Sequence, residues 1–477
     1  MMQETILTPK PMETAALWAV SPLDGRYHDA LRDFSGIMGE AALIQRRLEV
    51  EIRWMLWLDE KLPDALFPRL GTGERASLTG RIQDCGPESL ARIKALESTV
   101  RHDVKAVELY LREATALDSF GSRLAPFWHF ACTSEDINNL AYALIWRTAQ
   151  DDFLLPALAA IKDWLGGEAR TWARTPMLSR THGQPATPTT LGKELANFAF
   201  RLGTTQKSLQ RFNFSAKFNG AVGNYNAHVL ALPDVDWITL SRDFVSSFGF
   251  DFNPLTTQIE PHDRLAEWLD LLSRTNLILL DLCRDFWGYI AMDYFLQRAV
   301  AGEVGSSTMP HKVNPIWFEN AEGNIGLANA VLRHLAEKLP ISRFQRDLSD
   351  STALRNVGVG IGHTLLAWRM IREGLSRIAV HLETLRGDLD RHPEVLGEAI
   401  QTLLRQAGRA DAYDQIKDLT RGQPLDRAQL ATWLSASALP PGIAEQITHL
   451  AQATYTGLAG KLAEKLDDFL DESKHHD

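Results

Sequence analysis

Three long stretches of the chain contain neither glycine nor proline, and this feature constrains the fold more than any other. They span residues 88–120, 127–155 and 262–287. Glycine and proline destabilise a helix interior by about 1 and 3 kcal/mol, so such stretches favour long helices. If helical, residues 262–287 form a rod about 39 Å long. Their apolar side chains fall on more than one face, which predicts a helix buried on several sides, as in a bundle.

Signals for strands are sparse. The chain has few alternating β-branched runs, and its one Asn-Gly pair, Asn219-Gly220, lies in a loop-like stretch. We therefore predict an all-α protein with a long central helical bundle. A length of 477 residues fits about three domains. The predicted domains are an N-terminal helical domain (1–121), a central long-helix bundle (122–375) and a C-terminal helical domain (376–477).

Composition places the chain among acidic globular proteins. Apolar residues make up 45% of it, too many for a largely disordered chain. The net charge of −10 argues against nucleic acid as a partner. The most apolar stretch, residues 276–292, is interrupted by Asp281, Arg284 and Asp285, so we expect no membrane span. The N-terminus shows no secretory signal pattern.

The three cysteines, Cys85, Cys132 and Cys283, lie far apart in the sequence. This pattern is typical of a reducing cytoplasm and argues against a disulfide framework or a zinc–thiolate site. Residues 358–362 (GVGIG) do not match the dinucleotide-binding fingerprint and predict close helix packing instead. The sequence contains no P-loop, HExxH or GxSxG motif.

Polar stretches lie between the expected helices, where functional residues commonly sit. These stretches are residues 21–27, 131–139, 179–190, 302–315 and 343–356. In the fourth, Lys312, Asn314 and loop N–H groups suit a carboxylate or a developing oxyanion; the alternative is an ordinary connection. In the third, Gly183 and Pro185 argue against a helix, so His182 is expected to project from a loop. Histidine is suited to moving protons near pH 7, although most histidines are surface or core residues.

Thr133 and Asp136 predict a capping box at a helix start, with Asp in place of Glu. A helix cap is the plain interpretation. In the functional interpretation, the same N-terminus, with the Thr133 and Ser134 hydroxyls, binds a carboxylate or phosphate.

Three arginines, Arg343, Arg346 and Arg355, lie near Ser351 and Thr352 in the sequence. Arginines beside hydroxyls suit bidentate binding of phosphate. A solvated charged face is the commoner explanation for such a cluster, and the sequence alone leaves both open.

Taken together, these segments resemble the adenylosuccinate lyase family of the fumarase/aspartase superfamily. Residues 305–315, GSSTMPHKVNP, match the superfamily signature GSSxMPxKxNP at every fixed position. Resemblance to the bacterial purine-biosynthesis branch rests on SPLDGRY, RHDVKAVE, TSEDINN, RTHGQPATPTT, QIEPHD and SRFQRDLSDSTALRN. The resemblance runs from about Trp18 to about Arg421.

The resemblance implies two eliminations of fumarate in de novo purine biosynthesis. One converts adenylosuccinate to AMP, and the other converts the succinyl-carboxamide ribotide (SAICAR) to AICAR. It also implies a carbon–nitrogen lyase without a metal or organic cofactor, built as a three-domain helical protomer. We expect a cytoplasmic homotetramer with shared active sites, acting on these small nucleotides. Two alternatives stay open: another fumarate-releasing relative such as argininosuccinate lyase, and a non-catalytic structural relative.

The resemblance also assigns residue roles by motif position. Ser306 is the expected general base and His182 the expected general acid. Residues expected to hold the succinyl carboxylates are Thr133, Ser134, Gln258, Ser307, Lys312 and Asn314. Residues expected to bind the phosphate are Arg26, Tyr27, Arg346, Ser351 and Arg355. Residues expected to line the nucleotide site or to orient His182 are His102, Asp103 and Asn320. Arg101 stands where a small polar residue is expected, so the pocket wall is expected to differ there.

Overall fold

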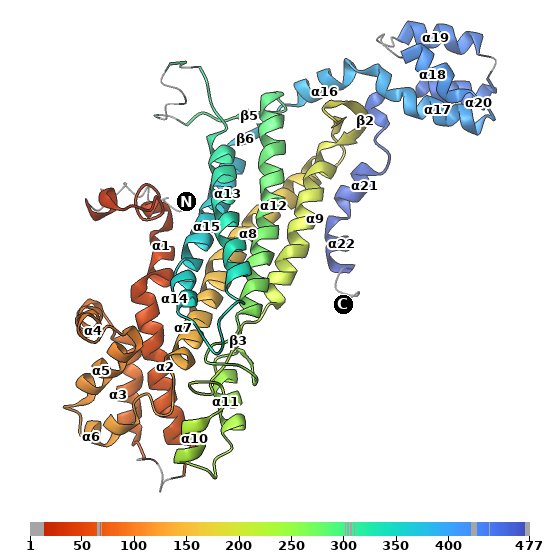
Figure 1. Ribbon diagram of the computed structural model, residues 1–477. Helices are drawn as coiled ribbons and strands as arrows, with labels where there is room; N and C mark the ends of the chain where they lie inside the picture. Colours follow the sequence, from red (N-terminus) through yellow and green to blue (C-terminus); the bar gives the residue numbers. More distant parts are fainter. Residues whose placement is uncertain are drawn as a thin grey trace. The chain divides into compact units, whose positions relative to one another are not determined.

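The computed structural model describes residues 14–63, 67, 69–300, 302, 305, 308–309, 311–420, 427–437 and 439–472. Helices dominate this part of the chain, and its strands form only two-stranded sheets (Figure 1). The predicted all-α class is therefore confirmed. None of the described helices is both long enough and apolar enough to span a membrane.

The elements have the following bounds. The helices are α1 (His28–Met38), α2 (Glu40–Lys61), α3 (Thr72–Gln83), α4 (Pro87–Val100), α5 (Asp103–Thr115), α6 (Gly121–Leu124), α7 (Ser134–Ala149), α8 (Leu155–Thr171), α9 (Leu191–Arg211), α10 (Asn226–Ala231), α11 (Trp237–Ser246), α12 (Asp263–Ala291), α13 (Ile316–Lys338), α14 (Ser349–Leu354), α15 (Val357–Ser376), α16 (Leu382–Asp390), α17 (Gly397–Gln406), α18 (Ala412–Thr420), α19 (Arg427–Ala436), α20 (Pro441–His449), α21 (Ala459–Glu464) and α22 (Leu466–Glu472). The strands pair as β1 (Pro176–Thr181) with β2 (Gln184–Thr190), β3 (Ser215–Ala216) with β4 (Asp251–Phe252), and β5 (Phe295–Gln297) with β6 (Ile378–Val380). The β3–β4 pair is parallel and the other two are antiparallel.

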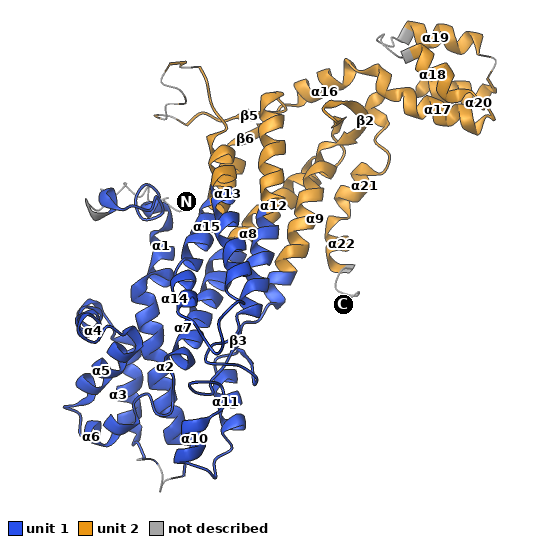
Figure 2. Ribbon diagram, viewed as in Figure 1, with its two compact units in different colours: residues 1–156, 208–276, 324–366 blue, residues 157–207, 277–323, 367–477 orange. Residues whose placement is uncertain are grey.

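The chain divides into two compact units (Figure 2). Unit 1 comprises residues 1–156, 208–276 and 324–366, and unit 2 comprises residues 157–207, 277–323 and 367–477. Each unit is thus assembled from segments that are distant in the sequence. The three-domain boundaries expected from the sequence stay a prediction.

Helices α2 and α7 form the centre of unit 1. Every residue of α7 from Glu135 to Trp146 is buried, and α7 packs along α2. A helix buried on all sides needs neighbours on all sides. Its first two turns contain the buried polar residues Asp136, Asn138 and Asn139, which need hydrogen-bond partners. Those partners define the candidate site described below.

Close packing between helices explains the glycines of residues 358–362. A Cβ added at Gly360 would lie 2.8 Å from Leu332 Cδ2, and one at Gly362 would lie 3.0 Å from Leu23 Cδ1. Real Cβ atoms rarely approach so closely, and a packed interior cannot easily move aside. The predicted role in helix packing is therefore confirmed for Gly360, which meets Leu332 of α13, whereas Gly362 meets Leu23 ahead of α1.

Unit 2 contains a separate cluster of short helices, α17–α20, which Figure 1 shows side by side. Leu396, Ile400, Leu404, Ile416 and Ile447 form its core.

Helix α12 is longer than predicted. It spans 29 residues, about 44 Å at 1.5 Å per residue, because it continues through Gly288. Leu279, Leu282 and Phe286 are buried, whereas Leu277 and Asp281 are exposed. The expectation that α12 is buried on several sides therefore does not hold for the helix face that carries Leu277 and Asp281.

Residues 88–120, expected as one long helix, are interrupted at Arg101 and His102. Arg101 ends α4 in the left-handed conformation, with φ 55° and ψ 33°. The His102 ring then caps α5 by accepting the Lys105 N–H at 3.1 Å. Cap chemistry, rather than glycine or proline, ends one helix and begins the next.

Residues 179–190, expected as a loop, lie mostly in the β1–β2 hairpin. Thr181 pairs with Gln184, so His182 and Gly183 form the turn. Both turn residues have positive φ, 55° and 74°. Proline is tolerated in β2 because each strand of a two-stranded ribbon has an unpaired edge.

Candidate functional site

The first turn of α7 is held by a buried carboxylate. The Thr133 N–H donates to Asp136 Oδ2 at 2.8 Å, which completes the predicted capping box. Asp136 also forms an ion pair with Lys217 at 2.8 Å. The local prediction for Thr133 and Asp136 is therefore confirmed. A helix N-terminus with nearby hydroxyls is suited to bind an anion.

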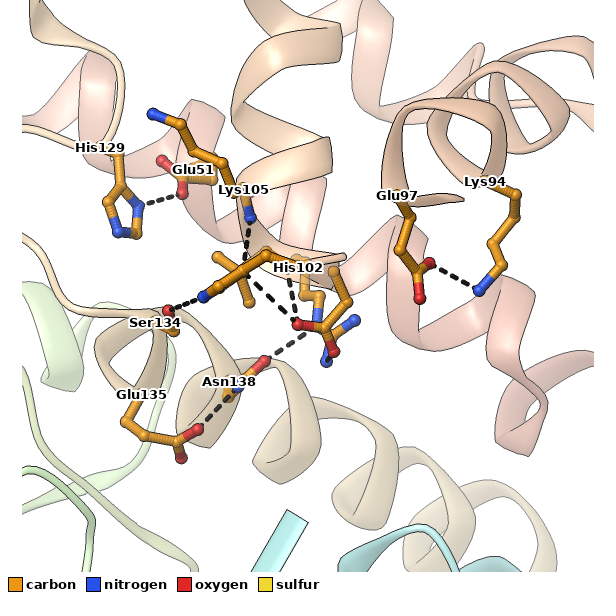
Figure 3. Close-up of polar contacts among 12 residues, drawn as sticks. Glu51, Lys94, Glu97, His102, Lys105, His129, Ser134, Glu135 and Asn138 are labelled. Carbon is orange, nitrogen blue, oxygen red and sulfur yellow. Dashed lines mark hydrogen bonds and ion pairs between the residues drawn. The ribbon is translucent and has the colours of Figure 1, made fainter. Parts of the chain in front are cut away.

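His102 lies beside this turn (Figure 3). Its Nε2 is 3.4 Å from Ser134 Oγ, and its Nδ1 accepts the Lys105 N–H. Because Nδ1 acts as an acceptor, a neutral ring carries its proton on Nε2 and donates toward Ser134. The structure thus brings together two residues predicted for different parts of the substrate site.

Asp103 is held between two arginines. Arg47 Nη2 lies 2.7 Å and Arg355 Nη2 lies 3.0 Å from Asp103 Oδ2. Burial raises the pKa of Asp103, but the charges of Arg47 and Arg355 outweigh it and hold the pKa below its usual value. Arg355 Nη1 also pairs with Glu40 at 2.9 Å. Asp103 therefore anchors an arginine that was predicted to bind phosphate.

Glu135 receives a second predicted arginine. Arg346 Nη2 lies 2.9 Å from Glu135 Oε1, and Asn138 donates to the same oxygen at 2.7 Å; Figure 3 shows the Asn138 contact. Burial raises the pKa of Glu135, while Arg346 opposes this change. Arg346 Nη1 also donates to Gln258 Oε1 at 3.2 Å. The side chain of Arg346 is only 17% exposed, so the solvated-face interpretation is wrong for this residue; it fits Arg343, whose side chain is 79% exposed.

The remaining predicted residues of unit 1 lie on α14 and ahead of α1. The Ser351 N–H donates to Asp350 Oδ1 at 2.6 Å, and Asp350 Oδ2 lies 3.4 Å from Arg346 Nε. Ser351 is thus linked to Arg346 through Asp350. Arg26 is exposed, and its guanidinium carbon is 5.9 Å from the centroid of the Tyr27 ring.

Arg101 is exposed on the surface next to His102. Its N–H donates to Glu97 O at 2.8 Å, which closes the last turn of α4. Arg101, which stands where a small polar residue was expected, therefore lies at a strained helix end. The left-handed conformation there costs a residue with a Cβ about 1 kcal/mol.

Sequence reasoning missed Arg47, which links two parts of the site. Its side chain is 2% exposed, and its Nε donates to Asn138 Oδ1 at 2.8 Å. The available signal was periodicity: Arg47 falls beside the apolar positions Ile44 and Leu48, on a face where a cation needs a buried partner.

The predicted residues of unit 2 belong to the hairpin turn, the signature loop and α13. His182 and Lys312 are exposed, and within the described ranges neither side chain forms a hydrogen bond or ion pair, so both are open to a ligand. Asn314 Nδ2 donates to Gly305 O at 2.9 Å. A Cβ at Gly305 would lie 2.1 Å from Lys312 O, so this glycine permits the close approach of its own backbone to that of Lys312. Asn320 is half-buried on α13. Ser306 and Ser307 lie outside the described residues.

A cavity of about 310 Å³ adjoins the signature loop in unit 2. It is lined in part by Gly305, Asn314, Trp317 and Arg377. In the part of the chain that the structure covers, no group of three or more His, Cys, Asp or Glu side chains could hold a metal ion. A reaction without a cofactor stays a prediction.

The two units offer different chemical groups. Unit 1 offers a helix N-terminus, an amide and arginines, which together suit carboxylates and phosphate. Unit 2 offers an imidazole and an ammonium group in solvent, which suit proton transfer and charge stabilisation.

Comparison with known families is consistent with this chemistry. Residues 25–331 match the family profile described as "Lyase", and residues 342–456 match the profile described as "Adenylosuccinate lyase C-terminal". The second match extends the likeness beyond Arg421, where the recognisable sequence motifs ended.

Curated relatives match almost the whole chain. The adenylosuccinate lyases of Escherichia coli K12 and Haemophilus influenzae are each 47% identical to it over 455 residues, 95% of this chain and 100% of the relative. Among solved structures, the 3-carboxy-cis,cis-muconate lactonizing enzyme from Pseudomonas putida superposes with a TM-score of 0.75 and 21% identity, covering 94% of this chain and 100% of the other. A fumarate lyase from Mesorhizobium sp. BNC1 gives a TM-score of 0.74 and 18% identity, covering 92% and 97%. These two likenesses concern the fold alone.

Proposed function

The chain belongs to the adenylosuccinate lyase family, and from this premise we propose its reaction, its residue roles and its assembly. The reaction is β-elimination of fumarate from adenylosuccinate, giving AMP, and from SAICAR, giving AICAR. The observation that carries this proposal is the identity of nearly half of all residues with bacterial adenylosuccinate lyases over their full length.

Two proton transfers are needed. A base removes a proton from the carbon next to a carboxylate, and an acid protonates the departing nitrogen, because an unprotonated amine leaves poorly. His182 is the proposed acid; its place at a hairpin turn, with an exposed ring that has no partner among the described residues, supports this role. Ser306 is the proposed base by its position in the signature motif. A serine hydroxyl must be ionised for this role, and loop N–H groups with Lys312 would favour the charged form.

The succinyl carboxylates bind at two groups of residues in this proposal. Thr133, Ser134 and Gln258 contribute from unit 1, and Ser307, Lys312 and Asn314 contribute from the signature loop. Removal of the proton places extra negative charge on one carboxylate, so these donors stabilise the transition state more than the substrate.

The phosphate group is proposed to bind Arg26, Tyr27, Arg346, Ser351 and Arg355. Arg346 and Arg355 have carboxylate partners within the chain itself. Their guanidinium groups are therefore held in place before the phosphate arrives, which lowers the ordering cost of binding. His102, Asp103 and Asn320 line the nucleotide part of the site in this proposal.

The proposed assembly is a homotetramer with active sites shared between subunits. Large apolar side chains support an association surface: on the long helices of unit 2, Phe200 is 39%, Leu277 42% and Trp287 47% exposed. Free cysteines support the proposal of a cytoplasmic enzyme, because reducing compartments keep thiols reduced.

Fumarate release from purified protein tests the reaction. Adenylosuccinate, SAICAR and argininosuccinate are supplied in parallel, and the absorbance of fumarate is followed. Release from the first two substrates alone is the expected result. Release from argininosuccinate instead would move the assignment to a sister lyase. No release from any substrate by folded protein would favour a non-catalytic relative.

Subunit mixing tests the shared site. Inactive His182→Gln and Ser306→Ala proteins are mixed after light scattering has established the assembly. Partial recovery of activity is expected, because some sites would combine an intact His182 with an intact Ser306. Complete failure to recover, with subunit exchange demonstrated, would contradict sharing.

A further inference from the structure

Lys217 is a buried cation without a role among the predicted site residues. Its Nζ lies 2.8 Å from Asp136 Oδ1, and both side chains are 0% exposed. Burying two charges removes their hydration, and hydrophobic residues of similar volume are often at least as stable as such a pair. Stability alone is therefore a weak explanation for this ion pair.

The contacts of Asp136 connect two separate pieces of backbone. Besides the Thr133 N–H, Asp136 accepts the Asn219 N–H at 3.0 Å and the Gly220 N–H at 3.1 Å. Lys217 Nζ donates to Gly220 O at 3.1 Å as well. One carboxylate and one ammonium thus fasten the start of α7 to the loop after β3.

Two further amides extend this connection. Asn139 Oδ1 accepts the Lys217 N–H at 2.8 Å, and Asn139 Nδ2 donates to Lys217 O at 3.1 Å. Further along the same loop, Ala221 O accepts a hydrogen bond from Gln258 Nε2 at 3.1 Å. The loop therefore contacts the α7 N-terminus on one side and Gln258 on the other.

We propose that Lys217, through its buried ion pair with Asp136, is a positioning residue for the succinyl-carboxylate site. The pair fixes the start of α7 against the loop and so sets the spacing between the Thr133 and Ser134 hydroxyls and the Gln258 amide. Lys217 also compensates the charge of Asp136, which would otherwise repel a carboxylate at the same helix N-terminus. This inference rests on the carboxylate role proposed above for Thr133, Ser134 and Gln258.

Product inhibition of adenylosuccinate cleavage tests the positioning role. Fumarate probes the carboxylate site, and AMP probes the nucleotide site. In Lys217→Met we expect the Ki of fumarate to rise about tenfold, within the ~10²-fold that a misplacement of about 1 Å can cost. The Ki of AMP should rise clearly less, since Arg355 in the proposed phosphate site is held by Glu40 and Asp103, which lie outside the junction of α7 and the loop after β3.

Gln150→Leu is the matched control for lost stability. Gln150 is buried just beyond the other end of α7, where its Oε1 accepts the Trp268 Nε1–H at 2.7 Å. This variant should lower the Tm while leaving the two Ki values in their parent ratio. A rise of both Ki values together in Lys217→Met would overturn the positioning role.

A double variant, Lys217→Met with Asp136→Asn, separates charge burial from positioning. The double variant leaves no uncompensated buried charge, so it should regain the Tm lost by Lys217→Met. If the single variant does not fold, the fumarate and AMP Ki values are compared in the double variant instead. Its fumarate Ki should stay raised, and a return to the parent value would overturn the inference.

Activity of the parent protein separates failure of the proposed reaction from failure of the positioning role of Lys217. If it releases no fumarate from adenylosuccinate, the proposed function fails. If it is active and inhibited by fumarate while Lys217→Met keeps the parent fumarate Ki, only the positioning role fails.

Discussion

Acid should destabilise this protein through the protonation of His228. The residue is 0% exposed, and in the described part of the chain neither of its ring nitrogens has a hydrogen-bond partner. The ring packs edge-on against Tyr225 and Trp237, with centroid distances of 5.5 and 4.8 Å. Burial, opposed by the charge of Asp136, lowers the pKa of His228 to about 4. An unfolded histidine keeps a pKa near 6.5, so the unfolded chain binds more protons between these values and stability falls as the pH falls through that window.

The size of this loss follows from the two pKa values. Complete protonation costs the difference between 6.5 and about 4, which at 1.36 kcal/mol per unit is about 3 kcal/mol. At pH 5 the linkage relation gives about 2 kcal/mol. His228→Phe keeps an aromatic ring in the same packing and removes the titration. The variant should therefore lose about 2 kcal/mol less stability than the parent between pH 7 and pH 5.

Urea unfolding at pH 7 and pH 5, at one protein concentration, measures this difference. Other groups also change the stability of the parent over this range, since burial lowers the pKa of His262 to about 4 and raises the pKa of Glu135 and Glu260; comparison with His228→Phe isolates the one residue. His334→Phe, at an exposed position on α13, is the control and should parallel the parent. Parallel profiles for His228→Phe and the parent would refute the reasoning and indicate a ring that is hydrated or hydrogen-bonded in the fold.

Three further changes test the packing and the proposed site. Gly360→Ala should lower the free energy of unfolding by about 1–3 kcal/mol, because the added Cβ meets Leu332 at 2.8 Å. Unchanged denaturant unfolding would mean that the contact between α13 and α15 accommodates the methyl group without cost. His182→Gln should lower kcat about 10²- to 10⁴-fold with little change in KM, as expected for an acid that acts in the transition state; a normal kcat in steady-state assays removes it from the chemistry. Arg355→Ala should raise the KM for adenylosuccinate about tenfold, roughly one charge-assisted hydrogen bond. The exposed Arg343→Ala serves as its surface control, and equal KM values for the two variants would contradict the phosphate role.

Features set by neighbours in the sequence could be predicted from the sequence alone. The capping box of Thr133 and Asp136 follows from a three-residue spacing, and its geometry is confirmed at 2.8 Å. The close approach at Gly360 was predicted for a similar reason, since glycine on a helix face without a nucleotide motif favours packing. In both cases one local pattern decides one local structure.

Features set by distant partners could not be predicted in this way. Lys217 meets Asp136, and Arg47 meets Asp103, only after the chain has folded. The spacing of these residues in the sequence therefore predicts neither ion pair. The helix break within residues 88–120 was not predicted, because Arg101 adopts a left-handed conformation that glycine usually occupies. The roles of Ser306 and of the other site residues still rest on motif position and stay proposals.

The pairing of Arg355 with Glu40 and Asp103 has a consequence for how ligands are selected. A phosphate that reaches Arg355 meets a cation whose charge two carboxylates already offset. Because these charges offset one another before any ligand binds, Arg355 adds little to long-range steering and little to the ionic-strength dependence of kcat/KM; a steep fall of kcat/KM with added salt would speak against it. Discrimination at this arginine then comes from the fit of the planar guanidinium, held in a fixed orientation, to its ligand rather than from attraction at a distance.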